Sequence, residues 1–600
     1  MALPIEDYAL IGDCQTAALV GRDGSIDWLC FPRFDSASMF GALLGNEDHG
    51  RWLVAPIASL DETTTVTVTV SRKYRENTFI LVTTWVTDEG EVEVTDFMPY
   101  GNRRADVVRR IRGIRGTVAM HTELLIRFGY ATALPWLHQA PEAGGHAVIA
   151  VAGPDAIIAR GIELHSADHK HTADFTVSEG ETRDLTMTWY SAHRNPPAAV
   201  NVDDVLARTS EWWHNWAAHC EPSEQYPEIV KRSLLVLRAL THEDTGGIVA
   251  AATTSLPEWF GGSRNWDYRY VWLRDAALTL DVLLGHGYVA EAEAWRRWLL
   301  RAIAGDPADV QIMYGLSGER WLEEREIDSL PGYEGATPVR IGNGAFNQFQ
   351  GDVFGEVMVA LQAARRAGVH ENDFSWPLQR ALMTFVEDNW NRADNGIWEI
   401  RGPERYFTHS RVMLWAAMDC AITAVEEFGL EGPVENWIII REEIREEIER
   451  KGWDAERCTY TQYYGGTSVD ASLLQLPQVG YLAADDPRMV GTVAAIEDEL
   501  LVDGLVLRYR TESGVDGLPG GENPFLACSF WLVEQYASSG RVDDATVLMD
   551  RLVGFANDVG LISEEYDTVN ERQAGNTPQA LSHLALVRAA DSISKVKSGT

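Results

Sequence analysis

The stretch "ISEEYDTVNERQAG", residues 562–575, lies between two segments whose apolar residues recur at helical spacing. The first segment covers 542–555 and the second 577–592. The adjacent glutamates Glu564 and Glu565 make this connection acidic. Acidic connections are most often solvated loops, so the meaning of this one depends on its place in the fold. The helices around it indicate that place.

Twelve segments have apolar residues at i, i+3 and i+4, the pattern of amphipathic helices. They cover 227–242, 270–285, 289–303, 346–367, 373–392, 409–427, 434–451, 468–476, 487–499, 523–538, 542–555 and 577–592. The connections after odd-numbered segments are long: 243–269, 304–345, 393–408, 452–467, 500–522 and 556–576. Those after even-numbered segments are short: 286–288, 368–372, 428–433, 477–486 and 539–541.

This alternation predicts a double ring of six helical hairpins, with all long connections at one end. Connections in compact domains are normally short, and long ones are usually functional. The stretch 562–575 belongs to the sixth long connection. We therefore expect it at a functional face rather than in an ordinary solvated loop.

Residues 1–200 have the character of β-structure. The segment 63–74 alternates with period two, and 78–100 reads as two strands around an Asp-Glu-Gly turn. Residues 107–128 and 172–192 continue in the same style, which favours a β-sandwich. We expect a β-sandwich domain at 1–200, a helical linker at 201–226 and a helical domain at 227–600.

Composition excludes several classes of function. The chain has 51 basic and 89 acidic residues, a formal charge of −38, which repels nucleic acids and anionic membranes. No apolar run is long enough to span a membrane, and no signal peptide is visible. Six cysteines without CxxC spacing fit a reducing cytoplasm. Histidines without HExxH spacing indicate no metal site, and no cofactor is expected.

The long connections concentrate aromatic, arginine and acidic side chains. Among them are Trp259, Trp266, Trp272, Arg274, Asp275, Trp321, Glu324, Arg340, Trp398, Glu399, Arg405, Arg508 and Arg510. Flat rings cover the faces of sugars, and charged groups bind their hydroxyls. Two separated carboxylates can protonate a leaving oxygen and activate water. Neither a GK[ST] phosphate loop nor a GxSxG elbow is present. The connections therefore predict a sugar-binding pocket with hydrolytic chemistry.

Several stretches together resemble the family 15 glycoside hydrolases, which include glucoamylases, glucodextranases and bacterial trehalases. They are "YALIGDCQTAALVGRDGSIDWLCFPRFDS", "NWDYRYVWLRDAAL", "GIWEIRG", "LPGGENPFLACSFW" and "SEEYD". The resemblance covers nearly the whole chain. It implies an N-terminal β-super-sandwich, a helical linker and an (α/α)6 barrel of twelve helices, in agreement with the patterns above.

The resemblance also implies roles for individual residues. The family's general acid follows a tryptophan and maps to Glu399, and its general base maps to Glu564. The family's Arg-Asp pair, which holds the non-reducing glucose, maps to Arg274 and Asp275, and a further substrate arginine maps to Arg508. The expected substrate-binding set is Trp266, Arg274, Asp275, Trp398, Arg508, Glu565 and Tyr566. Glu565 stands where the family has glutamine, and its charge could raise the pKa of its neighbour.

Residue patterns alone leave alternatives open. Glu324 and Glu404 compete with Glu399 for the acid role, and Glu565 competes with Glu564 for the base role. Arg274 and Asp275 alone would read as a structural ion pair.

The expected function is an inverting, exo-acting α-glucoside hydrolase that releases β-glucose from trehalose, isomaltose or maltose-like substrates. A sugar phosphorylase on the same type of barrel and a non-catalytic sugar-binding protein remain alternatives. The linkage and the oligomeric state stay open.

Overall fold

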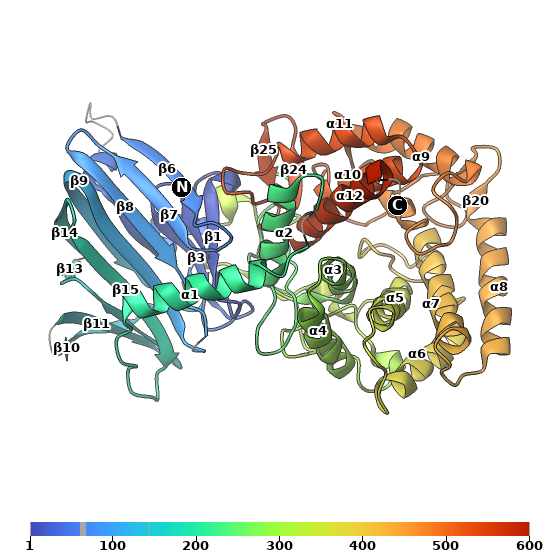
Figure 1. The fold of residues 1–600 in the computed structure, drawn as a ribbon, viewed down its shortest axis with the longest axis horizontal. Helices are drawn as coiled ribbons and strands as arrows, with labels where there is room; N and C mark the ends of the chain where they lie inside the picture. Colours follow the sequence, from blue (N-terminus) through green and yellow to red (C-terminus); the bar gives the residue numbers. More distant parts are fainter. Residues whose placement is uncertain are drawn as a thin grey trace.

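The computed structural model describes residues 2–60, 68–101, 103–142, 145–167, 169–221 and 223–598. Figure 1 shows a sheet region formed by the N-terminal part of the chain and a ring of helices formed by the rest. The predicted architecture of a large β-domain followed by a helical barrel is confirmed. Of the strand predicted at 63–74, residues 63–67 lie outside the described residues.

The sheet region contains fifteen strands in the described part of the chain. They are β1 (Tyr8–Gly12), β2 (Ala17–Gly21), β3 (Ser25–Cys30), β4 (Ser38–Phe40), β5 (Arg51–Pro56), β6 (Thr69–Tyr74), β7 (Leu81–Val86), β8 (Gly90–Phe97), β9 (Ala105–Leu125), β10 (Trp136–Glu142), β11 (Gly145–Ala152), β12 (Asp155–Arg160), β13 (His165–Ala167), β14 (Lys170–Ser178) and β15 (Thr182–Ser191).

The long strand β9 joins the two layers of the sandwich. Its first part pairs with β15 and its last part with β5, so one strand belongs to both layers. The Tyr74 hydroxyl of β6 bonds the backbone N–H and C=O of Leu10 in β1, across the interior. Arg109 of β9 binds Asp96 of β8 and backbone carbonyls of the facing layer. Apolar side chains fill the remaining interior.

Helix α1 (Val202–Ala217) runs from the sheet region to the ring of helices (Figure 1). At its centre Trp212 stacks on Tyr100, with ring centroids 3.6 Å apart. At its end Trp216 stacks on Tyr288 and donates its indole N–H to Glu291 of the ring. This helix therefore packs on both parts of the molecule.

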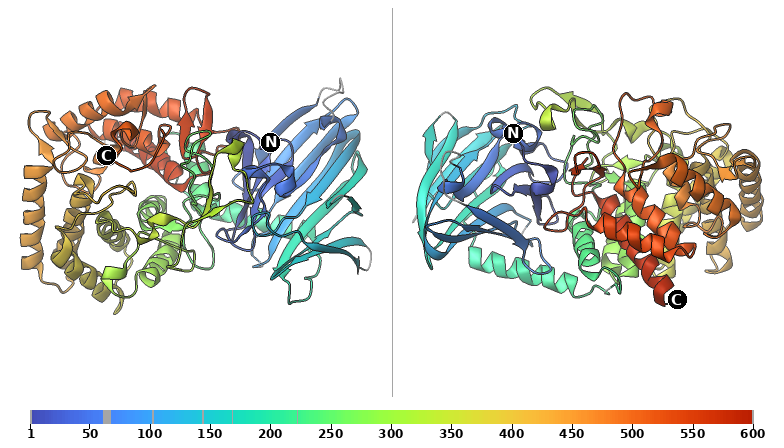
Figure 2. Two further views of the ribbon diagram at one scale, coloured as in Figure 1. Left: turned by 180° about the vertical axis from the view of Figure 1, so that it is seen from behind. Right: turned by 90° about the horizontal axis from the view of Figure 1, so that it is seen from above.

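The view from behind in Figure 2 shows the helices arranged in a ring. All twelve predicted helical positions are occupied. The helices are α2 (Pro227–Ala239), α3 (Leu273–Gly285), α4 (Val289–Ala302), α5 (Asp352–Arg366), α6 (Ser375–Asn389), α7 (Thr408–Glu426), α8 (Val434–Lys451), the 3-10 helix η8 (Ala471–Gln475), α9 (Pro487–Leu500), α10 (Leu526–Ser538), α11 (Val542–Val553) and α12 (Ala580–Ser598). The eighth position is thus a short 3-10 helix, not an α-helix. Long 3-10 helices are uncommon because their hydrogen-bond geometry is poorer than that of an α-helix. This one has five residues.

Local sequence explains the elements. In α8 the buried residues Trp437, Ile440, Ile444 and Ile448 recur every three or four positions, while the opposite face is acidic and basic. Helix α9 begins at Pro487, and Asp486 caps its first turn. No helix in the described part of the chain is long and apolar enough to cross a membrane.

Candidate functional site

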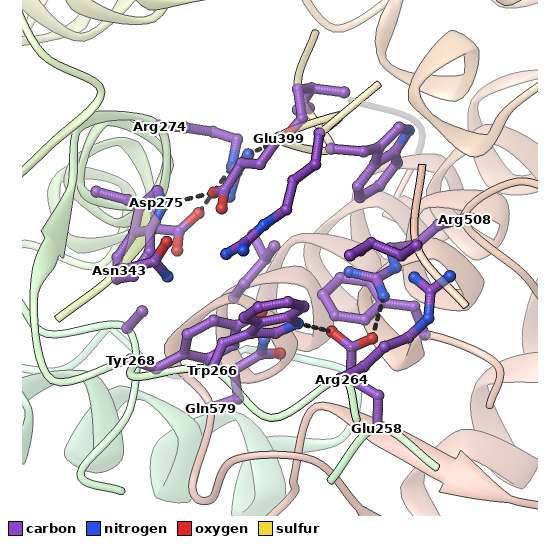
Figure 3. Close-up of a pocket in the computed structure, with 18 of the residues that line it drawn as sticks. Glu258, Arg264, Trp266, Tyr268, Arg274, Asp275, Asn343, Glu399, Arg508 and Gln579 are labelled. Carbon is purple, nitrogen blue, oxygen red and sulfur yellow. Dashed lines mark hydrogen bonds and ion pairs between the residues drawn. The ribbon is translucent and has the colours of Figure 1, made fainter. Parts of the chain in front are cut away.

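The long connections of the ring build one pocket (Figure 3). Side chains from the first, second, third and fifth connections and from the helices that follow them surround it. They are Ala250, Glu258, Arg264, Trp266, Tyr268, Trp272, Arg274, Asp275, Asn343, Ile397, Trp398, Glu399, Arg401, Arg508, Tyr509, Leu518, Phe525, Gln579 and Leu581. Of the last two, Gln579 directly precedes α12 and Leu581 lies in its first turn. Six of the nine residues expected at the site therefore line this pocket.

Glu399 stands on one wall of the pocket. Its Oε1 accepts a 2.6 Å hydrogen bond from the indole of Trp272, and its backbone lies in the left-handed region with φ 57°. A non-glycine residue in that region is strained, and such strain concentrates at functional sites. Burial raises the pKa of Glu399, while Arg274 and the Trp272 indole act in the opposite direction. The carboxyl group of Glu399 therefore lines the pocket with one oxygen held by an indole N–H.

Arg274 and Asp275 begin α3 beside Glu399. The Arg274 guanidinium donates to Asp275 at 3.0 Å and to the backbone carbonyl of Ile397 at 2.6 Å. Ile397 precedes Glu399 by two residues, so the pair is fastened to the chain that carries this acid. Both side chains border the pocket, and Asp275 is only 6% exposed. The pair therefore holds the backbone near Glu399 and also lines the pocket.

Glu564 is placed differently from the expectation. Its side chain is fully buried and lies behind Tyr268, which does line the pocket. The Tyr268 hydroxyl donates to Oε1 of Glu564 at 2.6 Å, and the backbone N–H of Asn576 donates to Oε2 at 3.3 Å. Burial, followed by repulsion from Glu258, raises the pKa of Glu564 to about 8. The carboxyl group of Glu564 therefore keeps its proton to a higher pH than an exposed glutamate does.

Glu258 lies across the pocket from Glu399 (Figure 3). It accepts hydrogen bonds from the Trp266 indole at 3.0 Å and from Arg508 at 2.8 Å. Arg508 also binds Glu522 at 2.7 Å, so this arginine is already paired with carboxylates where it lines the pocket. The expected residue Arg508 and the unexpected residue Glu258 therefore form a buried ion pair that lines the pocket.

Glu565 and Tyr566 do not reach the pocket. Glu565 is fully buried and accepts the backbone N–H of Asn523 at 3.0 Å. Burial and the neighbouring Glu258 hold the pKa of Glu565 well above its usual range. Tyr566 stacks on Phe555 with ring centroids 3.9 Å apart, away from the pocket. The two residues belong to strand β24 (Glu565–Asp567), whose successive side chains point to opposite sides, so Glu565 lies beside Glu258 and Tyr566 lies on the other side. Neither residue lines the pocket, and their expected contact with substrate stays a prediction.

Three carboxylates meet behind the pocket. Oxygen atoms of Glu258, Glu564 and Glu565 lie within 4.8 Å of one another, a spacing that could hold a cation. Protein donors already bind all three, because Trp266 and Arg508 bind Glu258, Tyr268 binds Glu564 and a backbone N–H binds Glu565. We assign no metal to this cluster.

The competing acids have other partners. Glu324 receives two hydrogen bonds from Arg401, and ion pairing outweighs burial so that its pKa is lowered. Glu404 is half-exposed, lies 3.8 Å from Arg392 and does not line the pocket. Neither Glu324 nor Glu404 lines the pocket.

The structure adds residues that sequence reasoning did not single out. They are Glu258, Arg264, Tyr268, Asn343, Arg401, Tyr509 and Gln579. Tyr268 lies two positions after Trp266 in an extended segment, so a period-two pattern could have placed both on the pocket side. The sequence contains no comparable signal for Glu258, because its cationic partner Arg508 comes from a distant connection.

Comparison with known proteins shows which family the chain is similar to. The model of "Glycosyl hydrolases family 15" matches residues 224–550 and 542–591, and the model "Trehalase-like, N-terminal" matches 1–201. The chain is 36% identical over 614 residues to "Trehalase" of Mycolicibacterium smegmatis, covering 98% of this chain and 90% of that protein. It is 35% identical over 584 residues to "Trehalase" of Thermoplasma acidophilum, covering 95% and 97%.

Among solved structures, a bacterial glucoamylase complexed with acarbose superimposes with a TM-score of 0.74 at 13% identity, over 99% of this chain and 94% of that one. That likeness concerns the fold. Together with the full-length relatives and the family model, it confirms the resemblance inferred from the motifs. This chain belongs to glycosyl hydrolase family 15 and is a glycoside hydrolase.

Proposed function

We propose that this enzyme hydrolyses trehalose, an α,α-1,1-linked diglucoside, with inversion at the attacked anomeric carbon. The observation that carries the proposal is one pocket bordered by the indole-held Glu399 and, through Tyr268, by Glu564. The curated relatives named "Trehalase" support this linkage. Maltose-like and isomaltose-like glucosides are the other substrates to test.

Glu399 acts as the general acid. The Trp272 indole donates to its Oε1, so the proton to be transferred is on Oε2. Burial raises the pKa of Glu399 and favours the protonated form before the reaction. As the glucosidic bond breaks, this proton moves to the leaving oxygen, while the electron pair of the bond stays with that oxygen.

Glu564 acts as the general base. In its ionised form it accepts a proton from water as the water oxygen bonds to the anomeric carbon. The Tyr268 hydroxyl holds one carboxylate oxygen in place. Tyr268 lines the pocket while Glu564 lies behind it, so water reaches the base on the Tyr268 side. The buried pair Arg274 and Asp275 binds hydroxyl groups of the glucose that is attacked.

Proton NMR of the first products tests the proposal. Inversion converts each trehalose and one water into one β-glucose, from the attacked half, and one α-glucose, the leaving half. We expect equal amounts of both anomers before mutarotation. Only α-glucose would indicate retention and make Glu564 a nucleophile. Glucose phosphate would indicate a phosphorylase, and intact trehalose with measurable binding would indicate a sugar-binding protein.

A further inference from the structure

The extended segment Trp266–Tyr270 links the pocket to the sheet region. It pairs with residues 250–255, since the backbone N–H groups of Ala251 and Ser255 donate to the carbonyls of Tyr268 and Trp266. Side chains of an extended segment alternate between two sides. Trp266 and Tyr268 line the pocket, and Asp267 and Arg269 point away from it into the junction between the two parts of the molecule.

Arg269 is fully buried in this junction, and all five of its N–H groups have acceptors. Two of them bind Asp267, at 2.8 and 2.6 Å. The others reach the sheet region, where they bind the Ser36 carbonyl at 2.8 Å, the Tyr130 hydroxyl at 2.8 Å and Cys30 Sγ at 3.4 Å. A planar guanidinium with every donor satisfied fixes the orientation of the backbone that carries it.

Tyr130 is itself held in an unusual conformation. Gly129, Tyr130 and Ala131 have φ of 61°, 58° and 62°, so three consecutive residues are in the left-handed region. Such conformations cost free energy for residues other than glycine and persist only where surrounding contacts enforce them. The Tyr130 N–H binds the Ser38 carbonyl, and the Ser329 hydroxyl binds the Tyr130 carbonyl. The sheet region thus presents a fixed hydroxyl to Arg269.

We propose that Arg269, anchored by Tyr130, is a positioning residue that fixes the Tyr268 hydroxyl against Glu564, so that the sheet region sets the geometry of the catalytic base. The inference rests on the proposed role of Glu564. Arg269 does not line the pocket. It acts through its neighbour in the chain, Tyr268. Because one extended segment carries both side chains, a rotation of Arg269 turns Tyr268 as well.

The electrostatics give the expected sign. The bond from Tyr268 stabilises the ionised form of Glu564 and lowers its pKa, as does Arg508, whereas burial and Glu258 raise it. Weakening the bond from Tyr268 therefore moves the ionisation of Glu564 to higher pH. The titratable groups that face Arg269 are Asp267, Tyr130 and Cys30. They lie on the side of the extended segment that points away from the pocket.

The test is a double-mutant cycle of Tyr130→Phe and Tyr268→Phe in the full chain, with trehalose as substrate. Tyr130→Phe removes one acceptor of Arg269 and leaves the pocket chemically intact. We expect kcat to fall roughly tenfold with little change in KM, which is less than the 10²-fold cost of a 1 Å misplacement. The acidic limb of the kcat/KM profile should move to higher pH. Tyr268→Phe should do the same, and the double variant should lose little more than Tyr268→Phe alone.

Tyr333→Phe is the matched control. The Tyr333 hydroxyl also joins the two parts of the molecule, donating to the Leu3 carbonyl at 2.9 Å, but it has no contact with the segment Trp266–Tyr270. This control should leave the pH profile unchanged. Arg269→Lys is a second variant, which keeps the charge but loses the planar fork, and it should reproduce the effect of Tyr130→Phe.

Several results would overturn the inference. They are unchanged kcat in Tyr130→Phe, additive effects in the cycle, the same pH shift in Tyr333→Phe, or losses that merely follow the unfolded fraction in thermal melting. A wild-type enzyme that releases no glucose would instead refute the proposed function, so the two failures are distinguishable.

Discussion

Glu399 and Glu564 occupy opposite kinds of environment in one site. Glu399 faces the pocket beside the cation of Arg274, and an indole N–H holds one of its oxygens. Glu564 is fully buried beside Glu258 and Glu565, and a tyrosine separates it from the pocket. One carboxyl group therefore has a cationic neighbour, and the other is surrounded by like charges.

This difference in surroundings bears on the acid role proposed for Glu399 and the base role proposed for Glu564. Titratable groups whose surroundings differ can take different protonation states at one pH. On the Glu564 side the like charges are offset by Arg508, which binds Glu258 and Glu522 and lies 3.5 Å from Glu565.

The largest expected effects come from removing either carboxyl group. Glu399→Gln and Glu564→Gln should each lower kcat on trehalose by at least about 10²-fold, because acid and base act in one transition state. Steady-state glucose release measures this, with circular dichroism to verify folding. Glu404→Gln and Glu571→Gln, exposed or half-exposed acids of the same two connections, should remain near wild type. Normal turnover in either main variant would reassign that role, first to Glu258.

The next effect concerns the sugar clamp on the Glu399 side. Asp275→Ala should lower kcat/KM by roughly 5- to 150-fold, which corresponds to about 1–3 kcal/mol for partners left unpaired. The loss should be similar for every α-glucoside that the enzyme accepts, since the attacked glucose is common to them. Asp281→Ala, an exposed position of the same helix, is the control. A loss confined to one linkage would place Asp275 at the leaving group instead.

The pH profile sharpens the comparison. Because Glu564 must be ionised to accept a proton and its pKa is raised to about 8, kcat/KM should fall as pH drops below about 8. Glu258→Gln removes a like charge, so this acidic limb should move to lower pH. The groups facing Glu564 that remain are Glu565, Arg508 and Tyr268. A limb that stays in place in Glu258→Gln would show that Glu564 does not sense this neighbour.

The smallest effect is on stability. In the unfolded chain a glutamate ionises near pH 4.5, but in the folded protein Glu564 ionises near pH 8, so the folded state retains its proton in between. Stability is full below the lower value and declines as pH rises towards the higher one. Glu564→Gln removes this decline, so its Tm should exceed that of wild type by a few degrees at pH 8 and match it near pH 4. Equal melting temperatures at both pH values would contradict the buried, late-ionising state of Glu564.

Much of the fold was predictable, because burial leaves a period in the sequence. Helix α8 shows its apolar stripe, and strands β7 and β8 show alternation around the Asp-Glu-Gly turn. The eighth helical position was less regular, and the structure has a 3-10 helix there. The clustering of Glu399, Arg274 and Asp275 in one pocket also agrees with the pattern of long connections.

The sequence by itself determined the ring of hairpins, the sheet region and the loops that build the pocket, since helical and strand periods are local properties of the chain. It did not determine which side chains line the pocket and which are buried away from it. Tyr566 follows Glu565 directly, yet it stacks on Phe555 because a strand turns successive side chains to opposite sides. The hydrogen bonds from Tyr268 to Glu564, from Arg508 to Glu258 and from Arg269 to Tyr130 join residues far apart in the chain. Only the tertiary structure brings such partners together, and their burial sets the charge state on which the chemistry depends.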